Sequence, residues 1–191
     1  MFVGLFFGSF NPIHVGHLII AQHFINETSL DQIWMVVSPH NPLKEKSTLA
    51  RDYDRLHLVQ LATEDNPNIK ASNIEFNLPK PSYTIDTLTY LKEKFPEHKF
   101  AIIMGADNLI SLPKWKNYEI LLRDYPIFVY KRPNYNIENI NYPNSEINVL
   151  DASLLDISST KIRELIKSGK SVQYLVPEKV FEELQLLRIY K

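Results

Sequence analysis

Short apolar runs alternate along the chain with segments whose apolar residues recur at helical spacing. The runs are bounded by turn residues and predict buried strands; they lie at residues 2–7, 33–38, 69–76, 100–104, 127–130 and 147–150. The helical spacing predicts helices at 14–26, 51–64, 82–95, 159–168 and 177–187. Ser82 is the expected N-cap of the third helix, and Asp86 lies near its positive end.

Strands that alternate with helices predict βαβ units. We therefore expect an α/β fold, namely a Rossmann-like, doubly wound and mainly parallel sheet with helices on both faces. Residues 1–191 contain neither a repeat nor a linker, which predicts a single domain. Residues 134–148, rich in Asn and Pro, are expected to be irregular. In such folds ligands bind at the carboxyl ends of the strands, where the connections switch sides.

The bulk composition is typical of a soluble globular protein, with 45% hydrophobic residues, 23% charged residues and a formal net charge of −1. This near-neutral balance argues against a nucleic-acid partner, which favours a basic surface. The absence of cysteine excludes disulfides and thiolate chemistry. No stretch approaches the roughly 20 apolar residues of a membrane span, and the first seven residues lack the basic start of a signal peptide. We therefore expect a cytoplasmic protein with no membrane partner.

The most informative segment follows the first predicted strand and reads Gly8-Ser9-Phe10-Asn11-Pro12-Ile13-His14-Val15-Gly16-His17. A Gly-Ser turn lets the backbone approach a ligand closely, and the helix start beyond it offers unpaired N–H groups and a positive dipole end. His14 and His17 are three residues apart, so on a helix they face the same way. Either feature alone is also typical of ordinary packing. Together they predict a phosphate site, although neither a dinucleotide fingerprint nor a Walker A loop is present.

A second candidate segment near the end of the chain reads Ile157-Ser158-Ser159-Thr160-Lys161-Ile162-Arg163. Ser158 or Ser159 can cap the helix that follows, and the free N–H groups at its start suit an anion. Arg163 lies one turn into that helix, and its planar guanidinium suits phosphate oxygens. Alone, the segment is typical of a capped helix with a solvent-facing arginine. With the histidine segment, it predicts a second clamp on one triphosphate.

Three further features follow predicted strands. Gly105 permits close backbone approach, and Asp107 can accept hydrogen bonds from ribose hydroxyls or cap the next helix. Lys44 lies in the loop after residues 33–38, and Arg132 follows residues 127–130. Each is a candidate phosphate contact, although loop cations are usually only solvated.

The histidine segment closely resembles that of the H-x-G-H nucleotidyltransferases, and among them the bacterial nicotinate-mononucleotide adenylyltransferases. Their usual segment reads Gly-Gly-Thr-Phe-Asp-Pro-Ile-His-x-Gly-His, whereas Ser9 and Asn11 stand here for the commoner Thr and Asp. The segment ending in Arg163 matches the second signature without gaps. Two departures are Lys116, where many relatives have Tyr after Trp, and Leu43, where they often have His.

This resemblance implies adenylyl transfer from ATP, carried with Mg²⁺, to nicotinate mononucleotide, which yields deamido-NAD and pyrophosphate. It implies catalytic roles for His14, His17 and Arg163. The implied ATP contacts are Gly8, Ser9, Phe10, His17, Gly105, Asp107, Ile157, Ser158 and Arg163. The implied mononucleotide contacts are Lys44, Thr84, Trp115, Lys116 and Arg132, with aromatic rings stacking on the pyridine and Thr84 or backbone N–H groups binding its carboxylate.

Other activities remain open from the sequence. Alternative acceptors are nicotinamide mononucleotide, phosphopantetheine and the alcohol phosphate of a cytidylyltransferase, and a nucleotide-binding regulator without turnover is an alternative hypothesis. No protein-held metal is expected, because the two histidines have no evident third ligand nearby in the sequence. Oligomeric state is left open.

Overall fold

The strands form one parallel sheet. The computed structural model describes residues 1–39, 49–132, 135–151 and 156–190. The described strands are β1 (Phe2–Gly8), β2 (Gln32–Val37), β3 (Ile69–Ser72), β4 (Lys99–Gly105), β5 (Ile127–Tyr130) and β6 (Ile147–Leu150). They pair in the order β3-β2-β1-β4-β5-β6, and every pair is parallel. The Rossmann-like α/β fold predicted from the alternating pattern is confirmed.

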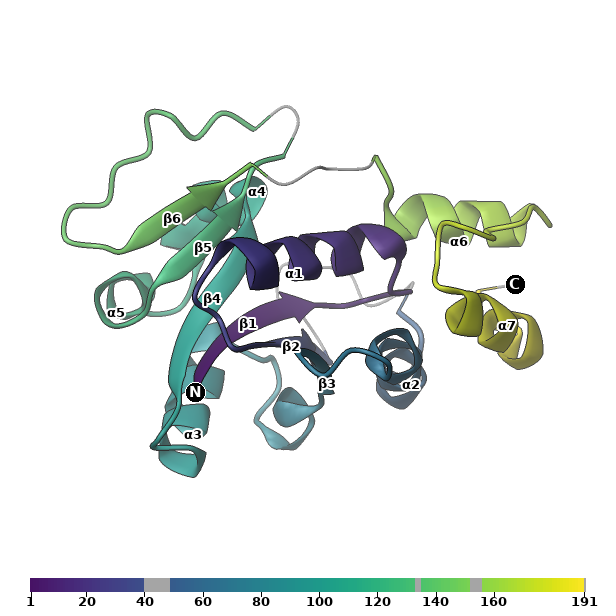
Figure 1. The fold of residues 1–191 in the computed structure, drawn as a ribbon, viewed down its shortest axis with the longest axis horizontal. Helices are drawn as coiled ribbons and strands as arrows, with labels where there is room; N and C mark the ends of the chain where they lie inside the picture. The colour runs from purple at the N-terminus through teal and green to yellow at the C-terminus, as the bar shows by residue number, and fades with distance from the viewer. Residues whose placement is uncertain (40–48, 133–134, 152–155, 191) are drawn as a thin grey trace.

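Helices cover both faces of this sheet (Figure 1). They are α1 (Val15–Glu27), α2 (Asp52–Thr63), α3 (Thr84–Lys94), α4 (Ala106–Ser111), α5 (Tyr118–Asp124), α6 (Ser159–Lys167) and α7 (Glu178–Leu187), with 3₁₀ turns η1 (Ile74–Asn77) and η2 (Leu112–Lys114). Helices α6 and α7 lie together beyond the end of the sheet that is remote from β6, and α7 packs beside α2. No helix in the described part of the chain is long and apolar enough to cross a membrane.

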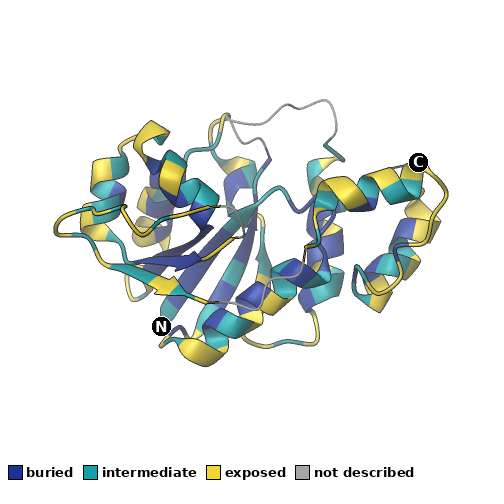
Figure 2. Cartoon of the chain, turned by 90° about the horizontal axis from the view of Figure 1, so that it is seen from above, coloured by how far each residue is buried: buried dark blue, intermediate teal, exposed yellow. Residues whose placement is uncertain are grey.

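Side-chain alternation along the strands divides the core into two layers. On β1, Val3 and Leu5 pack with α3 and α4, whereas Phe6 faces the layer that contains α1 and α2. The strands therefore form a mostly buried layer between the helices, as the dark-blue ribbons of Figure 2 show. Burial on both faces explains why the central strands β1 and β4 are nearly continuous apolar runs in the sequence.

The strand order places the topological switch between β1 and β4. The chain runs outward from β1 through β2 to β3 and, on the other side, from β4 through β5 to β6. Connections that leave the carboxyl ends of β1 and β4 diverge, which opens a crevice at this edge. The histidine segment follows β1, and Gly105 ends β4, so both lie at the crevice.

The structure corrects several predicted boundaries. The strand expected at 69–76 ends at Ser72, and residues 74–77 form η1, in which the Phe76 N–H binds the Asn73 carbonyl. Tyr83, not Ser82, is the N-cap of α3. Helices α4 and α5 were not predicted, because each is too short for a clear helical period. Residues 135–146 are irregular, as expected.

Phe24 tests the layer that supports α1. Its side chain is fully buried, and its ring centroid lies 6.0 Å from that of Phe128. Phe24→Ala should lower the free energy of unfolding by about 3–5 kcal/mol, because it leaves a cavity in a packed core. Urea denaturation measures this loss. Leu186→Ala, at a position that is 76% exposed, is the control and should change stability by less than about 0.5 kcal/mol.

Candidate active site

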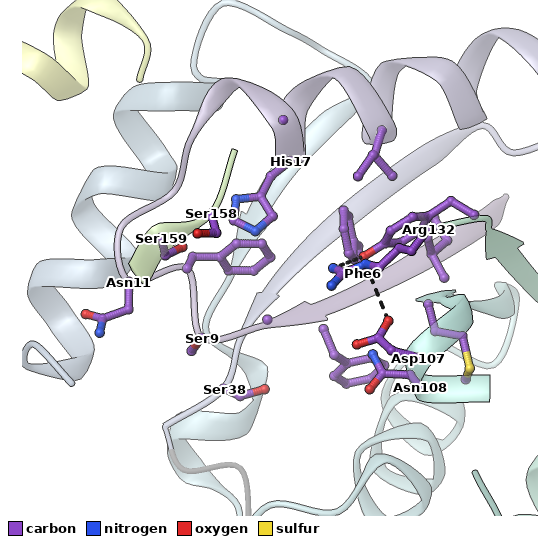
Figure 3. A pocket seen from close by; sticks show the side chains of 18 of the residues that line it. Phe6, Ser9, Asn11, His17, Ser38, Asp107, Asn108, Arg132, Ser158 and Ser159 are labelled. Atoms are coloured by element: carbon purple, nitrogen blue, oxygen red, sulfur yellow. Dashed lines mark hydrogen bonds and ion pairs between the residues drawn. The ribbon is translucent and has the colours of Figure 1, made fainter. Parts of the chain in front are cut away.

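A cleft of about 970 Å³ opens over the carboxyl ends of β1, β4 and β5. Side chains from both sequence signatures line it. Figure 3 shows His17, Ser158 and Ser159 on one side, with Asp107, Asn108 and Arg132 on the other. Of the predicted site residues, the described ones that line it are Gly8, Ser9, Phe10, His14, His17, Thr84, Asp107, Trp115, Lys116, Arg132, Ile157, Ser158 and Arg163.

The loop after β1 is shaped by a buried aromatic ring. Phe10 adopts φ 42°, an uncommon value for a residue other than glycine, and is 1% exposed. Its ring centroid lies 5.0 Å from that of His17, edge to face. Phe10 therefore packs against the ring of His17, a role in addition to the predicted ATP contact.

His14 and His17 come together as predicted, although His14 caps α1 instead of lying within it. Their rings stack with centroids 3.7 Å apart. The backbone N–H of His14 donates to Nδ1 of His17 at 3.3 Å. A ring nitrogen that accepts a hydrogen bond carries no proton, so neutral His17 holds its proton on Nε2 and can donate from that atom.

The ring of His14 is neutral at physiological pH. Burial, and secondarily the positive charge of Arg132, lowers the pKa of His14 to about 4. The ring is also tightly enclosed, because a Cβ on Gly16 would lie 3.1 Å from its Nδ1. The glycine between the two histidines therefore makes room for the imidazole.

Helix α6 brings the second signature to the same loop. Ser158 is its N-cap, with Oγ accepting the Lys161 N–H at 3.2 Å, which confirms the predicted cap. Ser159 Oγ donates to the Pro12 carbonyl at 2.9 Å, and Arg163 Nη1 donates to the Asn11 carbonyl at 2.8 Å. The two signatures, about 150 residues apart in sequence, are thus joined directly.

The end of β4 carries an ion pair. Arg132 Nε lies 3.4 Å from Asp107 Oδ1 (dashed in Figure 3), and Arg132 Nη2 donates to the Tyr130 hydroxyl at 2.8 Å. A Cβ on Gly105 would lie 2.9 Å from Arg132 Nε and still closer to Asp107 Oδ1. Glycine is therefore needed for this pair to form. Arg132, predicted to bind the mononucleotide, therefore pairs with Asp107, predicted to bind the adenosine.

The predicted acceptor side is formed by α3 and the turn before α5. Thr84 begins α3, and both Thr84 and the N-cap Tyr83 line this part of the cleft. Lys116 Nζ lies 2.9 and 3.0 Å from the two carboxylate oxygens of Asp86 and 4.9 Å from the Tyr83 ring centroid. Lys116 therefore ties the Trp115 turn to α3. Lys44 and Leu43 lie outside the described residues.

Comparison with known proteins agrees with this geometry. A profile of the cytidylyltransferase-like family matches residues 5–165. Relatives from Flavobacterium psychrophilum and Flavobacterium johnsoniae, each named "Probable nicotinate-nucleotide adenylyltransferase", are 54% and 55% identical over the whole of both chains. The chain belongs to the nicotinate-nucleotide adenylyltransferase family. A Plasmodium falciparum nicotinic acid mononucleotide adenylyltransferase, solved with NaAD, shares the fold at a TM-score of 0.81 and 17% identity, over 99% of this chain and 97% of that one.

A buried arginine that was not predicted holds the loop after β1. Arg55, on α2, is fully buried. Its guanidinium donates to the carbonyls of Ser9, Ser38 and Ala50 and pairs with Asp52. It therefore ties the loops after β1 and β2 together. Its helical spacing from Leu58 and Val59 on the apolar face was the available signal.

Glu75 is a second unpredicted residue of the adenylyltransferase cleft. It is 2% exposed, lines the cleft, and accepts a hydrogen bond from the Thr87 hydroxyl at 2.9 Å. Burial raises its pKa, while the hydroxyls of Thr87, Ser38 and Ser82 oppose that shift. Because Thr87 belongs to α3, Glu75 fixes this helix against η1. In the described part of the chain, no three His, Asp or Glu side chains are grouped to hold a metal.

Gly105→Ala tests whether Asp107, at the end of β4, takes part in ATP binding. The added methyl must displace Asp107 or Arg132, so the affinity for ATP should fall about tenfold or more if Asp107 binds the adenosine, as predicted. Isothermal titration calorimetry with ATP measures this. Ile110→Ala, at an exposed position of α4, is the control and should bind ATP normally; unchanged ATP affinity in Gly105→Ala would remove Asp107 from the site.

The pKa of His14 can be measured directly. In the unliganded protein its C2–H resonance should titrate with a pKa of about 4, well below the ordinary 6.5. A bound phosphate anion favours the imidazolium, so pyrophosphate should raise this value. NMR titration measures both, and the loss of the resonance in His14→Gln assigns it. An unliganded pKa near 6.5 would contradict the burial of this ring.

Proposed function

We propose that this protein transfers the adenylyl group of ATP to nicotinate mononucleotide, producing deamido-NAD and pyrophosphate. The observation that carries this is the joining of the His14–His17 pair, the α6 N-terminus and Arg163 at one cleft, with Trp115 and the α3 N-terminus at its other side. Helix N-termini and arginine suit phosphates. An aromatic side chain beside a helix N-terminus suits a pyridine carboxylate. Membership of the family supports the same reaction.

The reaction needs no nucleophilic side chain. A phosphate oxygen of nicotinate mononucleotide attacks the α-phosphorus of ATP; the new P–O bond forms as the bond to the pyrophosphate oxygen breaks. Catalysis is then positioning and charge stabilisation. His17 donates from Nε2 to an oxygen on which charge builds, while Arg163 and the N-terminus of α6 hold the phosphates.

We further propose that Mg²⁺ enters with ATP as part of the substrate. Mg²⁺ keeps several waters and bridges substrate phosphates in many phosphoryl-transfer sites, so it requires few protein ligands. Its chemistry there is to neutralise charge on the transferring and leaving phosphates. His17, Ser158 and Arg163, which line this part of the cleft, donate hydrogen bonds or carry positive charge, which suits a Mg²⁺–triphosphate complex whose net charge remains negative.

Pyrophosphate release tests the proposed reaction. With ATP and Mg²⁺, nicotinate mononucleotide should support turnover, and nicotinamide mononucleotide should be the poorer acceptor. His17→Asn should lower kcat by about 10²–10³-fold with little change in the free energy of unfolding, because a donor to the developing charge is lost. Near-normal turnover in His17→Asn would remove His17 from catalysis. An absence of turnover with both acceptors would contradict the proposed function.

A further inference from the structure

Asn11 is the residue at which separate parts of the chain meet the first loop. It is 3% exposed and lies between β1 and α1. Its backbone carbonyl accepts from Arg163 Nη1 at 2.8 Å. Its side-chain Oδ1 accepts from the Tyr190 hydroxyl at 2.7 Å and from the Ala50 N–H at 3.1 Å. The orientation of Asn11 therefore decides where the carbonyl that anchors Arg163 points.

The Tyr190 hydroxyl makes the shortest of these contacts, although it is 179 residues away in sequence. The side chain is partly buried and packs against the core layer that includes α1 and α2. Burial raises the pKa of Tyr190 above its ordinary value, so its hydroxyl stays protonated and donates. The backbone reaches this position with φ 50° at Arg188 and 71° at Tyr190. Two left-handed non-glycine residues are costly and persist where surrounding contacts fix them.

Helix α7 holds the segment from which Tyr190 extends. His57 Nε2 and Glu183 Oε1 are 3.1 Å apart, and Lys179 pairs with Asp65 at 2.8 Å. These contacts join α7 to α2 and the turn after it. Arg55 belongs to the same α2 and holds the Ser9 carbonyl. Arg55 of helix α2 and Tyr190 therefore both hold the loop after β1.

We propose that Tyr190 is a positioning residue for the ATP side of the cleft, acting through Asn11 on the loop after β1 and on Arg163. This inference rests on the proposed function. Removing the hydroxyl leaves Asn11 Oδ1 with one donor fewer, and the loop can then rotate. We expect binding of the triphosphate to weaken and binding of the acceptor to remain unchanged, because none of these three hydrogen bonds to Asn11 involves Thr84 or Trp115 on the acceptor side.

Tyr190→Phe removes the hydroxyl and keeps the ring. We expect kcat/KM for ATP to fall about three- to tenfold, the cost of one buried hydrogen bond, while KM for nicotinate mononucleotide stays within about twofold. Tyr174→Phe is the matched control, because Tyr174 is 84% exposed, and it should leave both parameters unchanged. A lower melting temperature with unchanged kcat/KM for ATP would show a purely structural contact and overturn the proposal.

A double-mutant cycle tests the route through Asn11. Tyr190→Phe should add no further loss of kcat/KM for ATP when Asn11 is already replaced by Ala. Independent, additive losses would overturn the proposal. If the wild-type protein turns over neither acceptor, the proposed function fails by itself. In that case calorimetry with ATP tests the role of Tyr190: weaker binding by Tyr190→Phe than by wild type supports it, and equal binding overturns it.

Discussion

The divergence of the chain at the carboxyl ends of β1 and β4 is the constraint on which the site depends. These strands are neighbours in the sheet, and the helices that follow them, α1 and α4, pack in opposite core layers. In the described part of the chain, the segments that leave these two strands turn to opposite faces of the sheet, so a crevice remains at that edge. The N-termini of α1 and α4 start beside it, and α6, which begins more than 130 residues after the end of α1, is brought to it. The position of the cleft therefore follows from the strand order and not from any single side chain.

An open crevice is useful for anions only if its backbone presents N–H groups and not carbonyls. Three carbonyls of the loop after β1 are held by side chains from other elements: Ser9 by Arg55, Asn11 by Arg163, and Pro12 by Ser159. Buried carbonyls need partners in any fold. Here the partners come from α2 and α6, which are packed against the loop. The same bonds occupy these carbonyls and fix the orientation of the loop.

The sequence predicted the parts of the fold that local pattern decides. The strands β5 and β6 matched residue for residue, because each is a short, mostly apolar segment preceded by turn residues. The capped start of α6 and the pairing of His14 with His17 also followed from residue type and spacing. Helices α4 and α5 did not, since six or seven residues carry too little period to separate a helix from a turn. Arg55, Glu75 and Tyr190 were missed for a related reason: helical spacing places Arg55 on the apolar face of α2, but no local pattern shows which distant groups these three side chains bind.

The charges of the unliganded cleft are largely balanced. Arg132 pairs with Asp107, Lys116 pairs with Asp86, and His14 is held neutral by burial. The paired side chains are 29–44% exposed, so each pairing offsets a positive charge at the surface of the cleft. A triphosphate and a mononucleotide supply new negative charge, which favours protonation of His14 and competes with the carboxylates for the cations. The electrostatic attraction between the cleft and the phosphates therefore develops when the substrates bind.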